Sequence, residues 1–104
     1  MSGGYELHPA AYDDLDGIWE FIAERNLDAA DRVIAEIRAA IGNLVPFPHV
    51  GHQRDDLAGR PLLFWPVRDY LIAYAPDKHP LWVLAVLHGR RNPRVIAAIL
   101  RERE

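Results

Sequence analysis

One apolar run constrains the fold of this chain more than any other feature. Residues 82–87 read Trp-Val-Leu-Ala-Val-Leu, and such a run is typical of a strand that is buried on both faces. A strand buried in this way lies inside a sheet rather than at its edge. The run continues into the polar segment 88–91 (His-Gly-Arg-Arg), and Asn92-Pro93 then predicts the N-cap and first residue of a helix. We therefore expect a rigid central strand with an interaction site at its solvent-facing end.

Length and composition limit the class of protein. The 104 residues suffice for one domain, which we expect to span residues 1–104, and 50% hydrophobic residues are enough for a core. The sequence shows neither an apolar run of about 18 residues nor a signal-peptide pattern. We therefore expect a cytoplasmic protein with no membrane partner. The chain contains no cysteine, which excludes disulfides, thiolate metal sites and cysteine nucleophiles.

Charge is distributed unevenly along the chain. The formal net charge is −3, which argues against a protein that coats nucleic acid. Residues 1–31 contain eight acidic residues and one basic residue, whereas residues 32–104 contain 11 basic and seven acidic residues. Every basic residue except Lys78 is arginine, which makes planar, bidentate contacts to carboxylates and phosphates. A basic region opposite an acidic one indicates an acidic partner, although an arginine-rich genome would give the same composition.

Two stretches near the N-terminus have the apolar spacing of amphipathic helices. His8-Pro9 opens the first helix, which should end near Asn26, and Asn26 or Asp28 caps the second. Because the connection between them is short, the two helices form an antiparallel hairpin with two apolar stripes to bury. The stripes comprise Ala11, Leu15, Ile18, Trp19 and Ile22 in the first helix and Ala30, Val33, Ile34, Ile37, Ile41 and Leu44 in the second.

The remaining elements are strands and a closing helix. Pro66 restricts its own strand to an edge or a bulge, because proline cannot donate to a ladder. Arg68-Asp69 falls where a two-residue hairpin turn is expected. The strands are expected at 5–8, 62–67, 70–74 and 82–87, and the helix from Pro93 to about Arg103. This order predicts an α+β fold: an N-terminal strand, an antiparallel helical hairpin packed on an antiparallel sheet with a three-strand meander, and a short C-terminal helix.

An ordered set of short motifs accompanies these elements. The motifs are Tyr5-Glu6-Leu7 with Pro9-Ala10, Asp14-Leu15 with Ile18-Trp19, Pro48-x-x-Gly51, Phe64-Trp65-Pro66-Val67 with Tyr70-Leu71-Ile72-x-Tyr74, and Val86-Leu87-His88-Gly89-Arg90-Arg91. With this set the chain resembles, over nearly its whole length, the RelE/ParE superfamily of toxins from bacterial type II toxin–antitoxin modules. The His-Gly-x-Arg ending is similar to the ParE branch. The chain departs from that branch at Leu63, where many ParE-like chains carry an arginine.

The resemblance to the ParE branch implies a toxin that inhibits DNA gyrase by binding, with no reaction or cofactor of its own and no sequence-specific contact to nucleic acid. It also implies a ParD-like antitoxin in a heteromeric complex, whose C-terminal segment folds as it wraps the toxin. RelE-like members are ribosome-dependent mRNA endonucleases, which commonly use a tyrosine or histidine near the C-terminus. Here the last tyrosine is Tyr74, and no residue after His88 titrates near neutral pH. A RelE-like endoribonuclease and a degenerate toxin that only binds its antitoxin are the alternatives.

The end of the central strand supplies the candidate site residues. His88, Arg90 and Arg91 could act as an acid–base group with a phosphate clamp, which is the nuclease interpretation. In the binding interpretation, the residues that contact the target or the antitoxin are Trp65, His88, Arg90, Arg91 and Arg94. In the structural interpretation, one arginine pairs with an acidic residue of the helical hairpin. We favour binding, because no second acid–base residue accompanies His88.

A histidine pair invites a metal interpretation. His49-x-x-His52, with Asp55 and Asp56 nearby, offers zinc ligands, but the spacing matches no standard site and the loop is bounded by prolines. We therefore expect a solvated loop and no metal.

Aromatic residues also alternate along the strands. Such residues can stack on bases in RNA-binding sheets, but at these positions they more often pack beneath helices or against a partner protein. We expect core or antitoxin contacts for Trp65, Tyr70, Tyr74 and Trp82.

Overall fold

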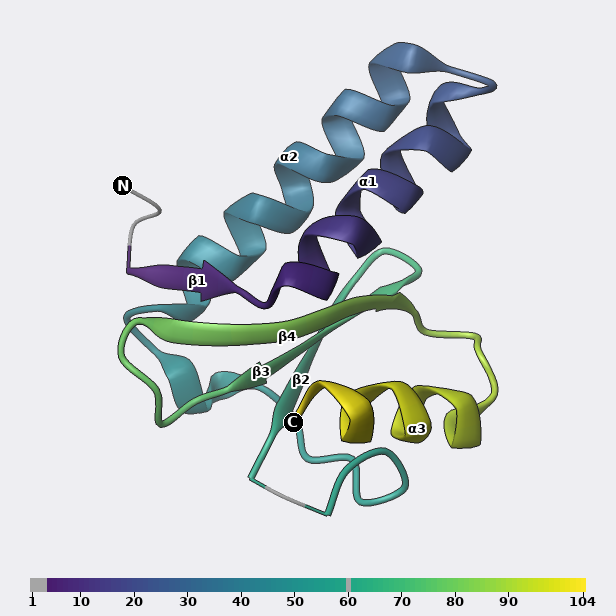
Figure 1. The fold of residues 1–104 in the computed structure, drawn as a ribbon. Coiled ribbons are helices and arrows are strands. Elements are labelled where there is room, and N and C mark those ends of the chain that lie inside the picture. The colour runs from purple at the N-terminus through teal and green to yellow at the C-terminus, as the bar shows by residue number, and fades with distance from the viewer. Residues whose placement is uncertain (1–3, 60) are drawn as a thin grey trace.

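The computed structural model describes residues 4–59 and 61–104, and it confirms the α+β class. Helices α1 and α2 form a hairpin on one face of a sheet, and α3 lies on the other face (Figure 1). The elements are β1 (Tyr5–Leu7), α1 (Pro9–Ala23), α2 (Leu27–Leu44), a short 3-10 helix η1 (Pro48–Val50), β2 (Leu63–Val67), β3 (Tyr70–Ala75), β4 (Leu81–His88) and α3 (Pro93–Arg103).

The sheet has the strand order β1-β4-β3-β2, so the apolar strand β4 is central as predicted. β2, β3 and β4 form the expected antiparallel meander, but β1 pairs with β4 in parallel, from Tyr5↔Leu81 to Leu7↔Val83. The sheet is therefore mixed: the predicted three-strand antiparallel meander is confirmed, and β1, whose direction the sequence analysis left open, joins it in parallel. β1 is separated from β4 by both helices and two strands, so no hairpin turn fixes its direction.

Local signals in the sequence set the helix starts. The Nδ1 atom of His8 accepts a hydrogen bond from the Ala10 N–H at 2.9 Å and precedes Pro9 at the first position of α1. Asn26 rather than Asp28 caps α2, with Oδ1 accepting from the Ala29 N–H at 2.9 Å. Asn92 caps α3 through the Arg94 N–H in the same way. No helix in the described part of the chain is both long and apolar enough to cross a bilayer.

The first core layer lies between the hairpin and the sheet. Ile37 and Ile41 of α2 and Ile72 and Val83 of the sheet are completely buried there. Ile22 and Ile34 of the predicted stripes are only partly buried. Trp19 lies outside the buried core, because its indole N–H donates to Asp31 Oδ1 at 2.8 Å and ties α1 to α2.

The second core layer lies between the sheet, α3 and the loop before β2. Its buried members are Leu57, Leu62, Phe64, Ala73, Leu84, Ala85, Leu87, Ile96 and Leu100. A register shift between Ala73 and Tyr74 places an extra residue in β4, because Ala73 pairs with Ala85 while Tyr74 pairs with Val83. β4 is thus buried on both faces, as its apolar run predicts.

The outer edge of β2 is protected. Phe64 exchanges two backbone hydrogen bonds of 2.8 Å with His52, so the Phe64 N–H faces away from β3. Pro66, two residues further on, also faces outward, and its missing N–H costs the sheet no ladder bond. At the turn into β3, Arg68 has a positive φ of 54°, and its guanidinium makes two hydrogen bonds to Glu36 of α2.

Candidate interaction site

His88 occupies the last position of β4, and its side chain shapes the turn that follows. The Nδ1 atom accepts a hydrogen bond from the Arg90 N–H at 3.1 Å, so Nδ1 carries no proton in this arrangement. The imidazole meets the ring of Tyr70 edge-on, with 5.5 Å between centroids. Tyr70 lies opposite His88 in the β3–β4 pair, a neighbour that the sequence analysis did not assign to the site.

Gly89 allows two turns to approach each other. Its N–H donates to the Asp69 carbonyl at 2.7 Å, and a Cβ at this position would lie 3.3 Å from the same oxygen. The chain then turns through Arg90 and Arg91, whose N–H donates to the His88 carbonyl at 3.1 Å, before α3 begins. The rigid strand end therefore fixes where the arginine backbone lies.

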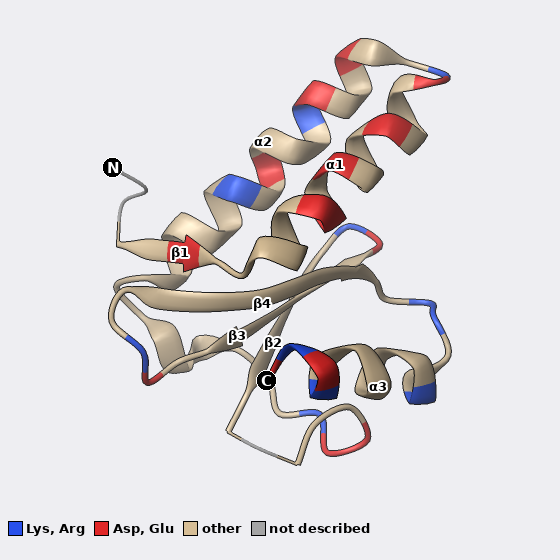
Figure 2. Ribbon diagram, in the orientation of Figure 1, with Lys and Arg blue, Asp and Glu red and all other residues tan. Residues whose placement is uncertain are grey.

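His88 ends β4, Arg90 and Arg91 follow in the turn, and Arg94 lies in the first turn of α3. Figure 2 shows basic positions at this junction. All three arginines are exposed, and none of them forms an ion pair within the described part of the chain. The structural interpretation, in which Arg90 or Arg91 pairs with an acidic residue of the hairpin, is therefore wrong. Ion pairs with acidic residues of the hairpin are made instead by Arg68 with Glu36 and by Arg103 with Asp14.

Asp14 and Arg103 connect all three layers of the protein. The guanidinium of Arg103 makes hydrogen bonds of 2.6 and 3.0 Å to the Asp14 carboxylate and one of 3.0 Å to the Leu84 carbonyl. Asp14 Oδ2 also accepts the Val86 N–H at 3.0 Å. α1, β4 and α3 therefore meet at one partly buried ion pair, which joins residues 89 positions apart.

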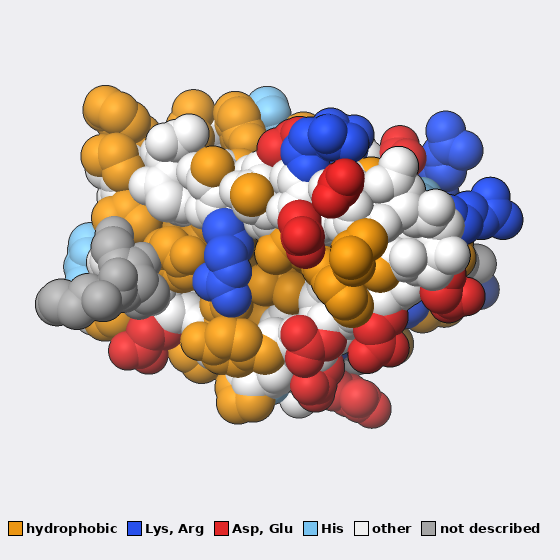
Figure 3. Space-filling view, turned by 90° about the horizontal axis from the view of Figure 1, so that it is seen from above, with side chains coloured by type: hydrophobic (Ala, Val, Ile, Leu, Met, Phe, Trp, Pro, Cys, Tyr) orange, Lys and Arg blue, Asp and Glu red, His pale blue; other side chains and the backbone are white. Residues whose placement is uncertain are grey.

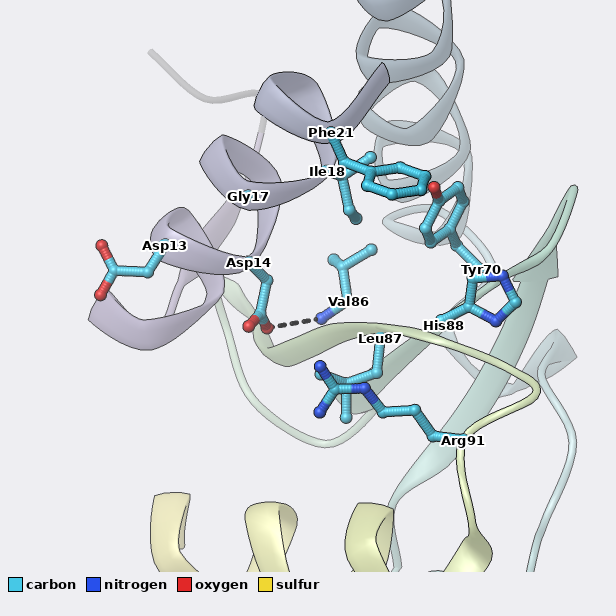
Figure 4. Close-up of a pocket in the computed structure, with 10 residues that line it drawn as sticks. All are labelled: Asp13, Asp14, Gly17, Ile18, Phe21, Tyr70, Val86, Leu87, His88 and Arg91. Carbon is cyan, nitrogen blue, oxygen red and sulfur yellow. Dashed lines mark hydrogen bonds between the residues drawn. The ribbon is translucent and has the colours of Figure 1, made fainter. Parts of the chain in front are cut away.

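A groove lies between α1 and the end of β4 (Figure 4). Its volume is about 430 Å³. Phe21 of α1 is 73% exposed beside it, and Arg91 reaches into it from the turn after β4. The lining residues are Asp13, Asp14, Gly17, Ile18, Phe21, Tyr70, Val86, Leu87, His88 and Arg91.

Trp65 is not part of this group. It lies on β2, the edge strand at the other side of the sheet, and stacks parallel to the imidazole of His52 with 5.9 Å between ring centroids. It lines a separate hollow with exposed Phe47 and Val50. Trp65 and His88 therefore lie on separate parts of the surface, because their strands β2 and β4 are separated by β3; the contact of Trp65 with a partner stays a prediction.

The two histidines of the 46–61 loop face different partners. His49 Nε2 lies 3.4 Å from Asp77 Oδ1 at the surface, whereas His52 stacks on Trp65. Within residues 4–59 and 61–104, no three side chains of His, Cys, Asp or Glu come together in a way that could hold a metal ion.

The two strand tyrosines are poor candidates for a general base. Burial, aided by the negative charge of Asp69, raises the pKa of Tyr70 above its usual value. Burial also raises the pKa of Tyr74, and the Tyr74 hydroxyl donates to the Pro48 carbonyl at 2.7 Å and accepts from the Gly51 N–H at 3.0 Å. Both phenols stay protonated near neutral pH, so neither can act as a general base there.

Fold and site together define a small α+β protein whose central strand ends in an exposed basic surface beside an open groove. The profile of a family described as ParE toxin of type II toxin-antitoxin system, parDE, matches residues 5–93. The chain therefore belongs to this family of toxins, which confirms the resemblance seen in its motifs. No curated protein matches the chain significantly.

Proposed function

We propose that this toxin acts in the cytoplasm by binding DNA gyrase and that a ParD-like antitoxin neutralises it in a heteromeric complex. The observation that carries the proposal is the exposed group of Arg90, Arg91 and Arg94, which lacks acidic partners among the described residues. Arginines of this kind are common recognition residues at protein interfaces. The phenol that contacts His88, Tyr70, cannot act as a base near neutral pH, and Asp14 is already bound to Arg103 and the Val86 N–H. We therefore favour binding over catalysis.

The deciding experiment compares two activities of the same purified protein. We expect the toxin to inhibit gyrase supercoiling and to leave mRNA intact in a translation extract. Arg91→Ala should weaken inhibition of supercoiling about tenfold or more, as loss of an interface arginine commonly does. Arg25→Ala is the matched control, because Arg25 is an exposed arginine in the connection between α1 and α2, away from β4.

His88→Gln separates binding from catalysis. Glutamine keeps a hydrogen-bonding side chain but removes the titrating imidazole, so a binding toxin should retain most of its activity between pH 6 and 8. A nuclease that used His88 as its acid or base would lose about 10²–10⁴-fold in cleavage rate. Ribosome-dependent cuts by the wild type that disappear in His88→Gln would overturn the proposal in favour of a RelE-like endoribonuclease.

A further inference from the structure

The edge of β4 is only partly covered along its length. β1 pairs with Leu81 to Val83, and the His8 N–H reaches the Val83 carbonyl at 2.8 Å, where the strand pairing ends. Beyond that point, Arg103 binds the Leu84 carbonyl and Asp14 binds the Val86 N–H. Two side chains thus take the place of a neighbouring strand along the middle of β4.

The last part of this edge has no such cover. The Val86 N–H points away from β3 and donates to Asp14. The Gly89 N–H points to the opposite side, toward β3, and donates to the Asp69 carbonyl. Because backbone groups alternate along a strand, the Val86 carbonyl and the His88 N–H also face away from β3. Neither group has a hydrogen-bond partner among the described residues. These two groups flank Leu87 and are positioned to pair with one residue of an added parallel strand.

The open edge coincides with the groove between α1 and β4, which is lined by Val86, Leu87 and His88 (Figure 4). Phe21 and Ile18 give the groove an apolar wall, and Gly17 leaves room beside them, with no atom within 4 Å of where its Cβ would be. An extended peptide that adds to a sheet edge gains main-chain hydrogen bonds, while such side pockets select its side chains. Strand end, apolar wall and free space are therefore all present in one place.

Charge identifies the kind of peptide that fits. Arg91 reaches into the groove and has no acidic partner among the described residues, and exposed Arg90 precedes it. Acidic side chains occur on both helices of the hairpin (Figures 2 and 3). Of the two that line the groove, Asp14 is already neutralised by Arg103, and Asp13 points away from Arg91 (Figure 4). An incoming segment therefore meets unpaired positive charge at the end of β4.

We propose that an extended segment of the antitoxin adds as a strand to the open edge of β4 at Val86–His88, with an apolar side chain against Phe21 and an acidic side chain on Arg91. The assignment of this occupant rests on the proposed neutralisation by an antitoxin. The Val86 carbonyl and the His88 N–H are its main-chain anchors.

Gly17 offers a direct way to block the groove. Gly17→Trp would project a bulky ring into it, and the affinity for the co-expressed antitoxin of the same module should fall about tenfold or more, by analogy with losses at interface centres. Gly17→Ala adds only one methyl group and should weaken antitoxin binding less than Gly17→Trp does. Gly42→Trp is the matched control, because Gly42 of α2 also has open space around its would-be Cβ but does not line the groove.

Amide hydrogen exchange measured by NMR reports the strand itself. In the free toxin the His88 amide should exchange quickly, and the Leu87 amide, which faces β3, should exchange slowly. In the complex the His88 amide should exchange about tenfold or more slowly, because it gains a backbone hydrogen bond, whereas the exchange rate of Leu87 should not change. Fast exchange of His88 in a saturated complex, or equal binding by Gly17→Trp and Gly42→Trp, would overturn the inference. If either result is found while the antitoxin still binds and neutralises the toxin, the inference falls but the proposed function stands.

Two other results would also count against the inference. If the antitoxin fails to bind the wild-type toxin at all, the proposed neutralisation is refuted and the inference falls with it. If His88 gains protection only when gyrase is added, the edge belongs to the target rather than to the antitoxin, and the assignment of the occupant is wrong.

Discussion

The ion pair between Asp14 and Arg103 should contribute strongly to stability, and a double-mutant cycle can measure how much. Both side chains are largely buried, with 13% and 14% of their surfaces exposed. Arg103→Met removes three hydrogen bonds and leaves the Asp14 carboxylate with only the Val86 N–H. Breaking one partner of a buried pair typically costs about 3–5 kcal/mol, and the remaining exposure places our expectation near 3 kcal/mol.

Asp14→Asn completes the cycle, because asparagine can still accept the Val86 N–H but cannot neutralise Arg103. The double variant should lose little more free energy of unfolding than either single variant does. The coupling energy between the two residues is then about 2–3 kcal/mol, at the upper end of the range for contacting residues. The assay is urea unfolding followed by circular dichroism, read as the shift in midpoint at constant m-value. Arg101→Met, an exposed arginine of the same helix, should change stability little.

Additive losses in this cycle, with a coupling energy below about 0.5 kcal/mol, would refute the reasoning. Such a result would mean that Arg103 acts through its alkyl chain and that α3 is not tied to α1 by charge.

Three further changes test the core, the β2–β3 turn and its ion pair. Ile37→Ala should cost about 2–5 kcal/mol in denaturation, because Ile37 is completely buried, and a loss below about 1 kcal/mol would contradict its place in the core. Arg68→Gly should be more stable than Arg68→Ala in thermal unfolding, since both lose the pair with Glu36 but only glycine relieves the positive φ. The hydrogen bonds from Arg68 lower the pKa of Glu36, so this pair should stabilise the protein above the usual glutamate pKa and lose its effect as pH falls through the lowered value. Glu36→Gln should abolish this part of the loss of stability at acidic pH. If the free energy of unfolding of Glu36→Gln falls with acidic pH as much as in the wild type, the prediction is contradicted.

Much of the fold could be predicted because its signals are local. Helical spacing of apolar residues, caps at Asn26 and Asn92, and prolines at first helical positions all act within a few residues. The apolar run of β4 predicted a central strand, and Pro66 predicted an edge strand, because both depend only on what a strand position tolerates. These predictions are confirmed.

Contacts between distant segments could not be predicted in the same way. The parallel pairing of β1, the Asp14–Arg103 pair and the position of Tyr70 beside His88 each depend on a register that no single stretch encodes. For the same reason the sequence could not show that Trp65 and His88, both partly buried strand residues, lie on separate parts of the surface. The alternation of β3 against β4 could have suggested Tyr70, because a two-residue turn at Arg68-Asp69 places residue 70 near the end of the next strand.

The protected outer edge of β2 has a consequence for aggregation. Exposed strand edges are templates on which further copies of a chain can stack. Here the backbone of His52 already forms hydrogen bonds with Phe64 on that edge, and Pro66 has no N–H to donate to an added strand. Growth of the sheet in that direction is blocked, whereas the opposite side retains its unpaired groups at Val86 and His88. A sheet that accepts a strand on one side only cannot propagate through its own copies, so pairing there should end in a finite complex instead of a fibre.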